Sequence, residues 1–123
     1  MPIRTLAEAI SHYGREAYLL TVAKDGPHTS NVTIELRGDC IGCNVGVSAA
    51  KNIAREPNVS LFWPPTEPGG YALIVNGAAT SEHQPTGVTT AEIVLAKSVL
   101  HRPGPKPGDS DGPCASDCHR LTR

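Results

Sequence analysis

Three polar residues, Ser48, Lys51 and Asn52, lie close together at the start of a segment whose composition predicts a short helix ended by Pro57. Ser48 is a residue type that caps helix N-termini. The first turn of a helix carries unpaired backbone N–H groups and a partial positive charge, so a lysine there suits a phosphate group. These residues predict the phosphate end of a cofactor site. The alternative interpretation is that Lys51 is a solvated residue on a connecting helix.

Four cysteines form two closely spaced pairs, Cys40 with Cys43 and Cys114 with Cys118, and His119 follows the second pair. Such spacing is found in zinc sites. Cys40 and Cys43 fall on a predicted strand, however, where residues three apart point to opposite faces. We therefore expect no metal site. Reduced thiols, or a disulfide in the tail, fit the pattern better.

Length and charge limit the kinds of protein that the sequence can encode. With 123 residues and a formal net charge of -1, the chain is expected to form one domain without affinity for nucleic acid or anionic membranes. Its longest apolar runs, such as residues 71–75, are the size of a strand, and the N-terminus lacks the apolar segment of a secretory signal. We expect a cytoplasmic protein.

The chain opens with a predicted amphipathic helix. Thr5 and Glu8 have the spacing of a capping box, and Gly14 is placed to end the helix. One face of this helix is apolar at helical spacing; it holds Leu6, Ala9, Ile10 and Tyr13. Such a helix is expected to cover one side of a sheet.

Three strands joined by tight turns follow, over residues 17–23, 28–37 and 40–45. The second strand alternates cleanly. One face would hold His28, Ser30, Val32, Ile34 and Leu36, and the other Thr29, Asn31, Thr33, Glu35 and Arg37. This arrangement predicts an antiparallel meander.

Further strands are predicted over residues 58–63, 71–79 and 92–101. In the last of these, Ile93, Leu95, Lys97 and Val99 would share one face. Residues 1–103 would form the folded domain, and residues 104–123 a flexible tail rich in Pro and Gly that carries two of the cysteines.

Six short strands with two short helices predict a mainly β protein, an antiparallel β-barrel. A barrel of about a hundred residues can be filled by its own side chains. A cofactor would then lie outside the barrel or between subunits, which favours a homodimer.

The order of motifs carries a family resemblance over roughly residues 6–103. The motifs are Asp25-Gly26-Pro27 at a turn, Asn31-Val32 on a strand, the run from Lys51-Asn52 through Pro57 to Val59-Ser60-Leu61, residues 74–79, and His101-Arg102-Pro103. With them the chain resembles the pyridoxamine-phosphate-oxidase-like, FMN-binding split β-barrel superfamily. The resemblance implies a homodimeric split barrel with two cofactors in grooves at the subunit interface. Members bind FMN, a deazaflavin coenzyme or haem, or have no known ligand.

The resemblance also implies roles for individual residues. Ser48, Lys51 and Asn52 would contact the cofactor phosphate, and the second-strand residues Ser30, Asn31 and Val32 would lie beside the ring. Because strand residues alternate, these last three cannot all face one groove through their side chains. The implied function is that of a flavin- or deazaflavin-dependent oxidoreductase-like protein.

Two departures from the family pattern bear on that function. Ala49 and Ala50 stand where flavin-binding relatives carry Arg or Lys, so one charge of the phosphate site is missing. Asn31 replaces a proline that is frequent at its position. Arg37 or Arg102 could supply the missing guanidinium across a dimer.

Two other functions remain open at this point. An exposed imidazole, with His28 or His101 as candidate axial ligand, could hold haem iron. The chain could also be a cofactor-free dimer that serves as a binding module. The only tryptophan, Trp63, is expected to pack in a subunit interface, with stacking on a cofactor ring as the alternative.

Overall fold

The computed structural model describes residues 3–103 and 116–123, which form two helices and seven strands. The elements are α1 (Leu6–Tyr13), β1 (Glu16–Ala23), β2 (Gly26–Arg37), β3 (Cys40–Val45), α2 (Val47–Arg55), β4 (Asn58–Trp63), β5 (Ala72–His83), β6 (Thr89–Pro103) and β7 (Ser116–Arg120). Cys114 lies outside the described residues.

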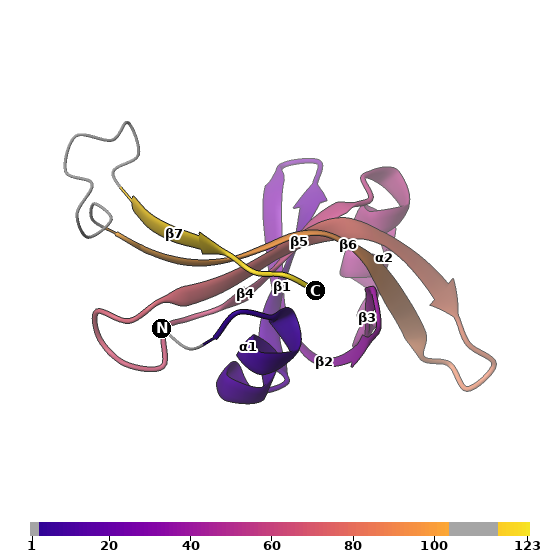
Figure 1. Cartoon of the computed structure of the whole chain (residues 1–123). Coiled ribbons are helices and arrows are strands. Elements are labelled where there is room, and N and C mark those ends of the chain that lie inside the picture. The colour runs from indigo at the N-terminus through magenta and orange to yellow at the C-terminus, as the bar shows by residue number, and fades with distance from the viewer. Residues whose placement is uncertain (1–2, 104–115) are drawn as a thin grey trace.

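All strand pairs are antiparallel, and six strands close into a barrel. The strand order is β3-β2-β1-β4-β5-β6, and β3 pairs with the first part of β6 to close the ring, while β7 pairs antiparallel with the last part of β6 (Figure 1). Closure removes the free edges that an open sheet would expose. The predicted mainly β barrel with two helices is confirmed.

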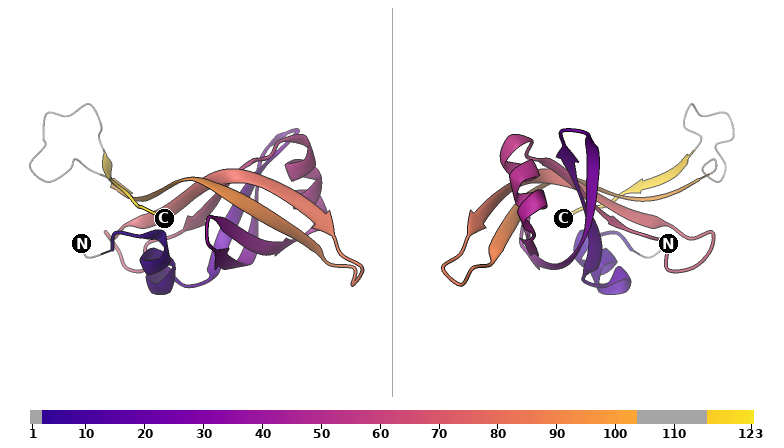
Figure 2. Two further views of the ribbon diagram at one scale, coloured as in Figure 1. Left: turned by 45° about the vertical axis from the view of Figure 1, so that its right-hand side comes forward. Right: turned by 180° about the vertical axis from the view of Figure 1, so that it is seen from behind.

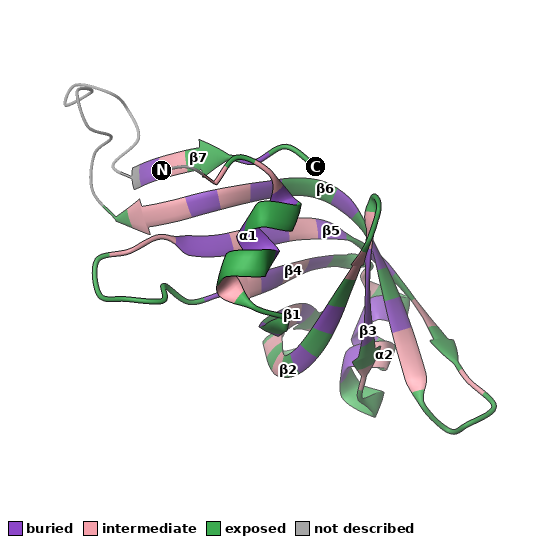
Figure 3. Ribbon diagram, turned by 60° about the horizontal axis from the view of Figure 1, so that its bottom comes forward, coloured by how far each residue is buried: buried purple, intermediate pink, exposed green. Residues whose placement is uncertain are grey.

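The two helices lie at different ends of β4 (Figure 2). Helix α1 has the predicted capping box, in which Thr5 accepts from the backbone of Glu8 and Glu8 accepts from the backbone of Thr5. Its buried face lies against the sheet (Figure 3). The Tyr13 hydroxyl donates to the carbonyl of Tyr71 over 2.5 Å. Helix α2 contacts β1, β5 and β6 near the other end.

The barrel core follows the alternation of the strands. On β2, Val32 and Ile34 are buried and Asn31 and Thr33 are exposed, so the predicted faces are confirmed. Trp63 is only 1% exposed, and its indole N–H donates to the carbonyl of Gly14 over 2.9 Å. The prediction that Trp63 packs in a subunit interface is wrong, because the ring fills the core of its own chain.

A β-bulge changes the predicted face of β6. Its pairing with β5 shifts between Asn76 and Gly77, which face Lys97 and Leu95 and leave Ala96 as the extra residue. Ile93 and Leu95 share one face, as predicted, and this face is the inner one, but beyond the bulge the buried positions are Ser98 and Leu100. Lys97 and Val99 face outward, contrary to the prediction.

Strand β7 corrects the prediction of a flexible tail for residues 116–120. These residues pair with β6 in a regular ladder from Val99–Arg120 to Pro103–Ser116. Leu121 follows in the core at 7% exposure, and Asp117 is fully buried. The composition of this segment does not indicate a strand, because the strand is stabilised by contacts with distant parts of the chain. The division at residue 103 into domain and tail stays a prediction.

Among the residues that the structure describes, neither helix has the length and apolar character needed to span a membrane.

Candidate cofactor site

Helix α2 carries three of the six predicted cofactor contacts. It begins at Val47 with Gly46 as N-cap and no side-chain capping bond, so Ser48 is not the cap that the sequence predicts. Lys51 consequently lies in the second turn of the helix and not in the first. Ser48 and Lys51, three residues apart, are both exposed and occupy neighbouring positions on one face.

Asn52 points the other way, into the protein. It is 6% exposed, and its amide donates to the hydroxyl of Thr21, itself 1% exposed, over 3.0 Å. The guanidinium of Arg55 donates to the carbonyl of Val22, next to Thr21. These two bonds fix α2 on β1, so the Asn52 side chain positions the helix that presents Lys51.

The three predicted contacts on β2 are divided between two faces. Ser30 and Val32 face the barrel interior, opposite Leu19 and Ala17 of β1, whereas Asn31 faces outward opposite Tyr18. The structure therefore brings Ser48 and Lys51 together and places Asn31 on the outer surface of the barrel. No single surface displays all six predicted side chains.

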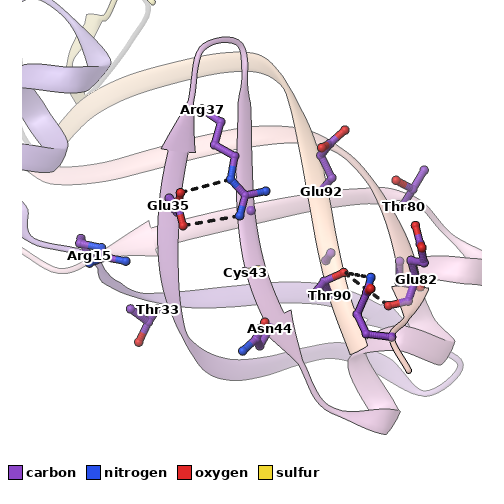
Figure 4. A pocket seen from close by; sticks show the side chains of 14 residues that line it. Arg15, Thr33, Glu35, Arg37, Cys43, Asn44, Thr80, Glu82, Thr90 and Glu92 are labelled. Atoms are coloured by element: carbon purple, nitrogen blue, oxygen red, sulfur yellow. Dashed lines mark hydrogen bonds and ion pairs between the residues drawn. The ribbon is translucent and has the colours of Figure 1, made fainter. Parts of the chain in front are cut away.

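A hollow of about 690 Å³ lies on the outer wall of the barrel, where β3 meets β6 (Figure 4). A row of paired residues crosses it, from Glu35 through Gly42 and Glu92 to Thr80. We call it the wall hollow. None of the six predicted contacts lines it; β2 contributes Thr33, Glu35 and Arg37 instead, and closure of the barrel adds residues of β3, β5 and β6. The outward alternation of Thr33, Glu35 and Arg37 was the only sequence signal for it.

The charges of the wall hollow favour a polar ligand over a dianion. Three glutamates (Glu35, Glu82 and Glu92) line it together with Arg15 and Arg37. Arg37 lies 3.4 Å from Glu35 and covers Gly42, where an added Cβ would be 2.8 Å from its Nη1. Because Gly42 has no side chain, the guanidinium of Arg37 can lie over it, in the row between Glu35 and Glu92.

Arg102, the other arginine considered for a cofactor phosphate, is engaged at the opposite end of β6. Its guanidinium approaches Oδ2 of Asp117 at 2.9 and 3.0 Å and stacks 4.6 Å from the ring centroid of Tyr71. Hydrogen bonds from Tyr71 and Arg102, with the nearby charge of His119, hold the pKa of Asp117 below its ordinary value. The same bond to Asp117 raises the pKa of Tyr71. This cluster anchors β7, and no motif in the sequence predicted it.

The candidate haem ligands have different surroundings. His28 is half-buried on the inner face of β2, and its Nδ1 is buried with no hydrogen-bond partner among the described residues. His101 is half-buried on β6 with its Nδ1 3.2 Å from the sulfur of Cys118. Within residues 3–103 and 116–123, no three His, Cys, Asp or Glu side chains form a metal-binding group.

Cys40 and Cys43 do lie on a strand, as predicted. Cys40 is half-buried and Cys43 is buried in the core, at 7% exposure, with Ile41 on the same inner face. Burial raises the pKa of the Cys43 thiol to about 11. The two thiols therefore point to opposite sides of the sheet.

The fold and the placement of α2 on a closed barrel define the class of protein as a split β-barrel. Solved structures share this fold: a candidate pyridoxamine 5'-phosphate oxidase from Listeria innocua has a TM-score of 0.65 and 19% identity, over 76% of this chain and 94% of that one. An F420 reductase has a TM-score of 0.62 and 16% identity, over 74% and 94% of the two chains. The haem storage protein HutZ of Vibrio cholerae has 0.60 and 12%, over 76% and 92%.

Sequence comparison gives a nearer relationship. No family model matches the chain. Uncharacterized proteins of Mycobacterium bovis and Mycobacterium tuberculosis are each 33% identical to it over 131 aligned positions, which cover 94% of this chain and 91% of each relative. The chain belongs to the family of these mycobacterial proteins, and its fold is that of the pyridoxamine 5'-phosphate oxidase-like split β-barrel superfamily, as the resemblance implied.

Proposed function

We propose that the protein binds a flavin-type cofactor, FMN or a deazaflavin coenzyme, and acts as an oxidoreductase-like homodimer with the cofactor in a groove at the subunit interface. The observation that carries the proposal is the exposed pair Ser48 and Lys51 on α2, in a fold shared with an F420 reductase. A bound flavin or deazaflavin would supply the hydride or electron chemistry, and the protein would supply position and electrostatics.

Each predicted contact has a part in this proposal. Lys51 and Ser48 would hold the phosphate, and Asn52 would position them through its buried bond to Thr21. Asn31 would lie beside the ring with its side chain, and Ser30 and Val32 would contribute only through their backbone, because they face inward.

The proposed homodimer has support in the outer face of the sheet. One row of paired outward residues crosses four strands: Tyr18, Phe62, Ile74 and Val99. Val22 and Val94 are 44% and 53% exposed. They line a groove of about 590 Å³ in the same outer wall, which we call the apolar groove. An apolar face of this kind is typical of subunit interfaces.

The missing charge before Lys51 gives a sharp test. Ala49 is buried against the barrel at 2% exposure, but Ala50 is half-exposed, so an arginine at Ala50 would reach solvent beside Lys51. If a phosphate binds there, Ala50→Arg should tighten FMN binding about tenfold and Lys51→Ala should weaken it about tenfold. Riboflavin, which lacks the phosphate, should bind both variants like the parent protein.

The measurement is flavin retention through gel filtration, followed by fluorescence titration with FMN, riboflavin and the deazaflavin coenzyme. Lys24→Ala, in the turn between β1 and β2, is the matched control. The flavin proposal fails if no flavin or deazaflavin is retained. If Lys51→Ala binds FMN with unchanged affinity, Lys51 is not part of the site.

A separate variant tests the proposed homodimer. Val94→Glu places a charge in the apolar groove and should convert a dimer into a monomer in analytical ultracentrifugation.

Haem binding is the second candidate, favoured by the Nδ1 of His28, which has no hydrogen-bond partner in the described part of the chain. The fold is also shared with a haem-binding protein of Mycobacterium smegmatis, at a TM-score of 0.61 and 15% identity over 93% of this chain and 56% of that one. A sharp Soret band with haemin that is lost in His28→Ala, or in His101→Ala, would support it. If neither flavin nor haemin is retained, the third candidate stands, a cofactor-free dimer that acts as a binding module.

A further inference from the structure

Two adjoining hollows surround the C-terminal end of β7, and both are basic. One, of about 250 Å³, is lined by Lys97, Arg120 and Arg123 together with apolar and hydroxyl residues of β6. The other, of about 450 Å³, is lined by Arg4, His119 and Arg120. Among the described residues, no Asp or Glu side chain lines either hollow, and Arg120, Leu121 and Thr122 belong to both. We call Arg4, Lys97, Arg120 and Arg123 the basic patch.

The bulge in β6 and the register of β7 bring two of these cations to one face. Beyond the bulge, Lys97 and Val99 point outward, and Val99 is the partner of Arg120. Lys97 and Arg120 therefore project from neighbouring strands on the same side of the sheet. Without the extra residue at Ala96, Lys97 would face the core side, where a cation could not stay unpaired.

The N-terminal segment is tied to the same place by backbone bonds. The N–H of Thr122 donates to the carbonyl of Arg4 over 3.0 Å, and the N–H of Leu6 donates to the carbonyl of Thr122 over 2.7 Å. The hydroxyl of Thr122 also donates to the carbonyl of Arg4, over 3.2 Å. These bonds hold the backbone at Arg4 beside that at Arg120, so the two ends of the chain form one surface.

Among the described residues, few acidic side chains lie near the basic patch. Asp39 lies 3.9 Å from Arg123, with both side chains exposed, and Glu8 accepts from the backbone N–H of Arg4 over 3.2 Å. Among the described residues, neither Lys97 nor Arg120 forms an ion pair. The chain has 11 Lys and Arg against 12 Asp and Glu, so four cations with two flanking acids are a local excess.

We propose that the basic patch binds a small organic anion that carries at least two phosphate or carboxylate groups. Arginine guanidinium groups pair bidentately with both kinds of group, and the cations are spread over two adjoining hollows, so a ligand with two charged ends can engage both. An exposed cation alone binds a single anion weakly, which makes two or more charges on the ligand necessary. The wall hollow, with its three glutamates, would reject the same ligand.

The test uses the full chain and two probes, inorganic pyrophosphate and citrate, followed by heteronuclear NMR of backbone amides and arginine Nε–H groups. Saturable shifts at residues 97 and 120–122 are expected, and they should shrink as salt is raised. Arg120→Ala, which removes the residue shared by both hollows, should weaken binding at least tenfold, and Lys97→Ala should weaken it several-fold. Equal affinities for the two probes would show that the charge of the ligand determines binding. A preference for pyrophosphate would identify phosphate groups as the ligand class, and a preference for citrate would identify carboxylate groups.

Matched variants separate this site from the proposed cofactor site. Arg37→Ala, an exposed arginine of the wall hollow, and Lys24→Ala should bind both probes like the parent protein. The proposal is overturned if Arg120→Ala binds unchanged, if no saturable shift appears, or if Lys51→Ala abolishes binding instead. The last result would place the anion at α2 and would support the flavin proposal, whereas loss in Arg120→Ala alone leaves that proposal unaffected.

Discussion

The hydroxyl of Tyr71 donates a 2.5 Å hydrogen bond to Oδ2 of Asp117, across 46 residues of sequence. Asp117 is fully buried, and Arg102 shares the same oxygen, while Oδ1 lies 2.9 Å from Nε2 of His119. One carboxylate thus joins β7 to β6 and to the segment that leads into β5. A buried charge is tolerated only when it is paired and hydrogen-bonded, so the attachment of β7 depends on the ionised state of Asp117.

Strand β7 should detach at low pH. The hydrogen bond from Tyr71, followed by those from Arg102, lowers the pKa of Asp117 in the folded state below its ordinary value of 3.8. A lowered pKa contributes stability that is fully present above the unfolded value and is lost as pH falls through the folded value. Amide exchange of residues 117–121, corrected for its intrinsic pH dependence, should therefore lose protection as pH falls below 3.8.

In Asp117→Asn the same amides should exchange faster at neutral pH and should show no such acid transition. Asp39→Asn, at an exposed position, is the control and should behave like the parent protein. Equal protection of β7 in Asp117→Asn and the parent would contradict the role of the carboxylate.

The two cysteines of β3 should differ sharply in reactivity. Burial raises the pKa of Cys43 to about 11, so at about pH 8 roughly one in a thousand Cys43 thiols is ionised. Cys40 is half-buried on the other face. Alkylation with iodoacetamide and peptide mass spectrometry should label Cys40 within minutes and leave Cys43 unmodified until guanidinium is added. Equal labelling of the two in the native protein would show that Cys43 is not buried.

Replacement of Trp63 by phenylalanine should destabilise the fold. The change removes ring volume from the core and leaves the carbonyl of Gly14 without the indole N–H, which together cost about 2 kcal/mol in the free energy of unfolding. Guanidinium denaturation measures this. Val88→Ala, in the exposed turn between β5 and β6, should change it by less than about 0.5 kcal/mol. A Trp63→Phe variant as stable as the parent would mean that the indole bond contributes nothing.

Alanine at Gly77 should be poorly tolerated. An added Cβ would lie 2.4 Å from the carbonyl oxygen of Val94 and 2.7 Å from Cγ2 of Ile93, so the bulge opposite would have to move. We expect a loss of about 3 kcal/mol in the free energy of unfolding. Gly46→Ser, which adds a capping hydroxyl to α2 in open space, should be neutral or gain a few tenths of a kcal/mol. Similar midpoints of thermal unfolding for the two variants would contradict the argument.

The local elements of the fold were readable from the sequence. The capping box of α1, the alternation of β2 and the turns around it specify these elements through contacts between residues near in sequence. The bounds of β3 and β4 were predicted as observed. The six-stranded barrel followed from counting six short strands with only two short helices among them.

Features that depend on distant contacts were not readable. The bulge between Asn76 and Gly77 turns Lys97 outward, whereas alternation alone placed it on the same face as Ile93 and Leu95. Trp63 was assigned to a subunit interface because the sequence does not show that the carbonyl of Gly14 accepts its indole N–H. Asn52, one of the predicted cofactor contacts, is buried and hydrogen-bonded to Thr21. The wall hollow was not predicted from the sequence.

The class of fold follows from the sequence alone, because hydrophobic period and turn chemistry act within a few residues. That residues 116–120 form a strand follows only from the assembled barrel, because Asp117 gains its partners Tyr71 and Arg102 there. The same assembly created the basic patch, since Arg4 and Arg120 meet through the backbone bonds of Thr122, and closure of β3 on β6 is what forms the wall hollow.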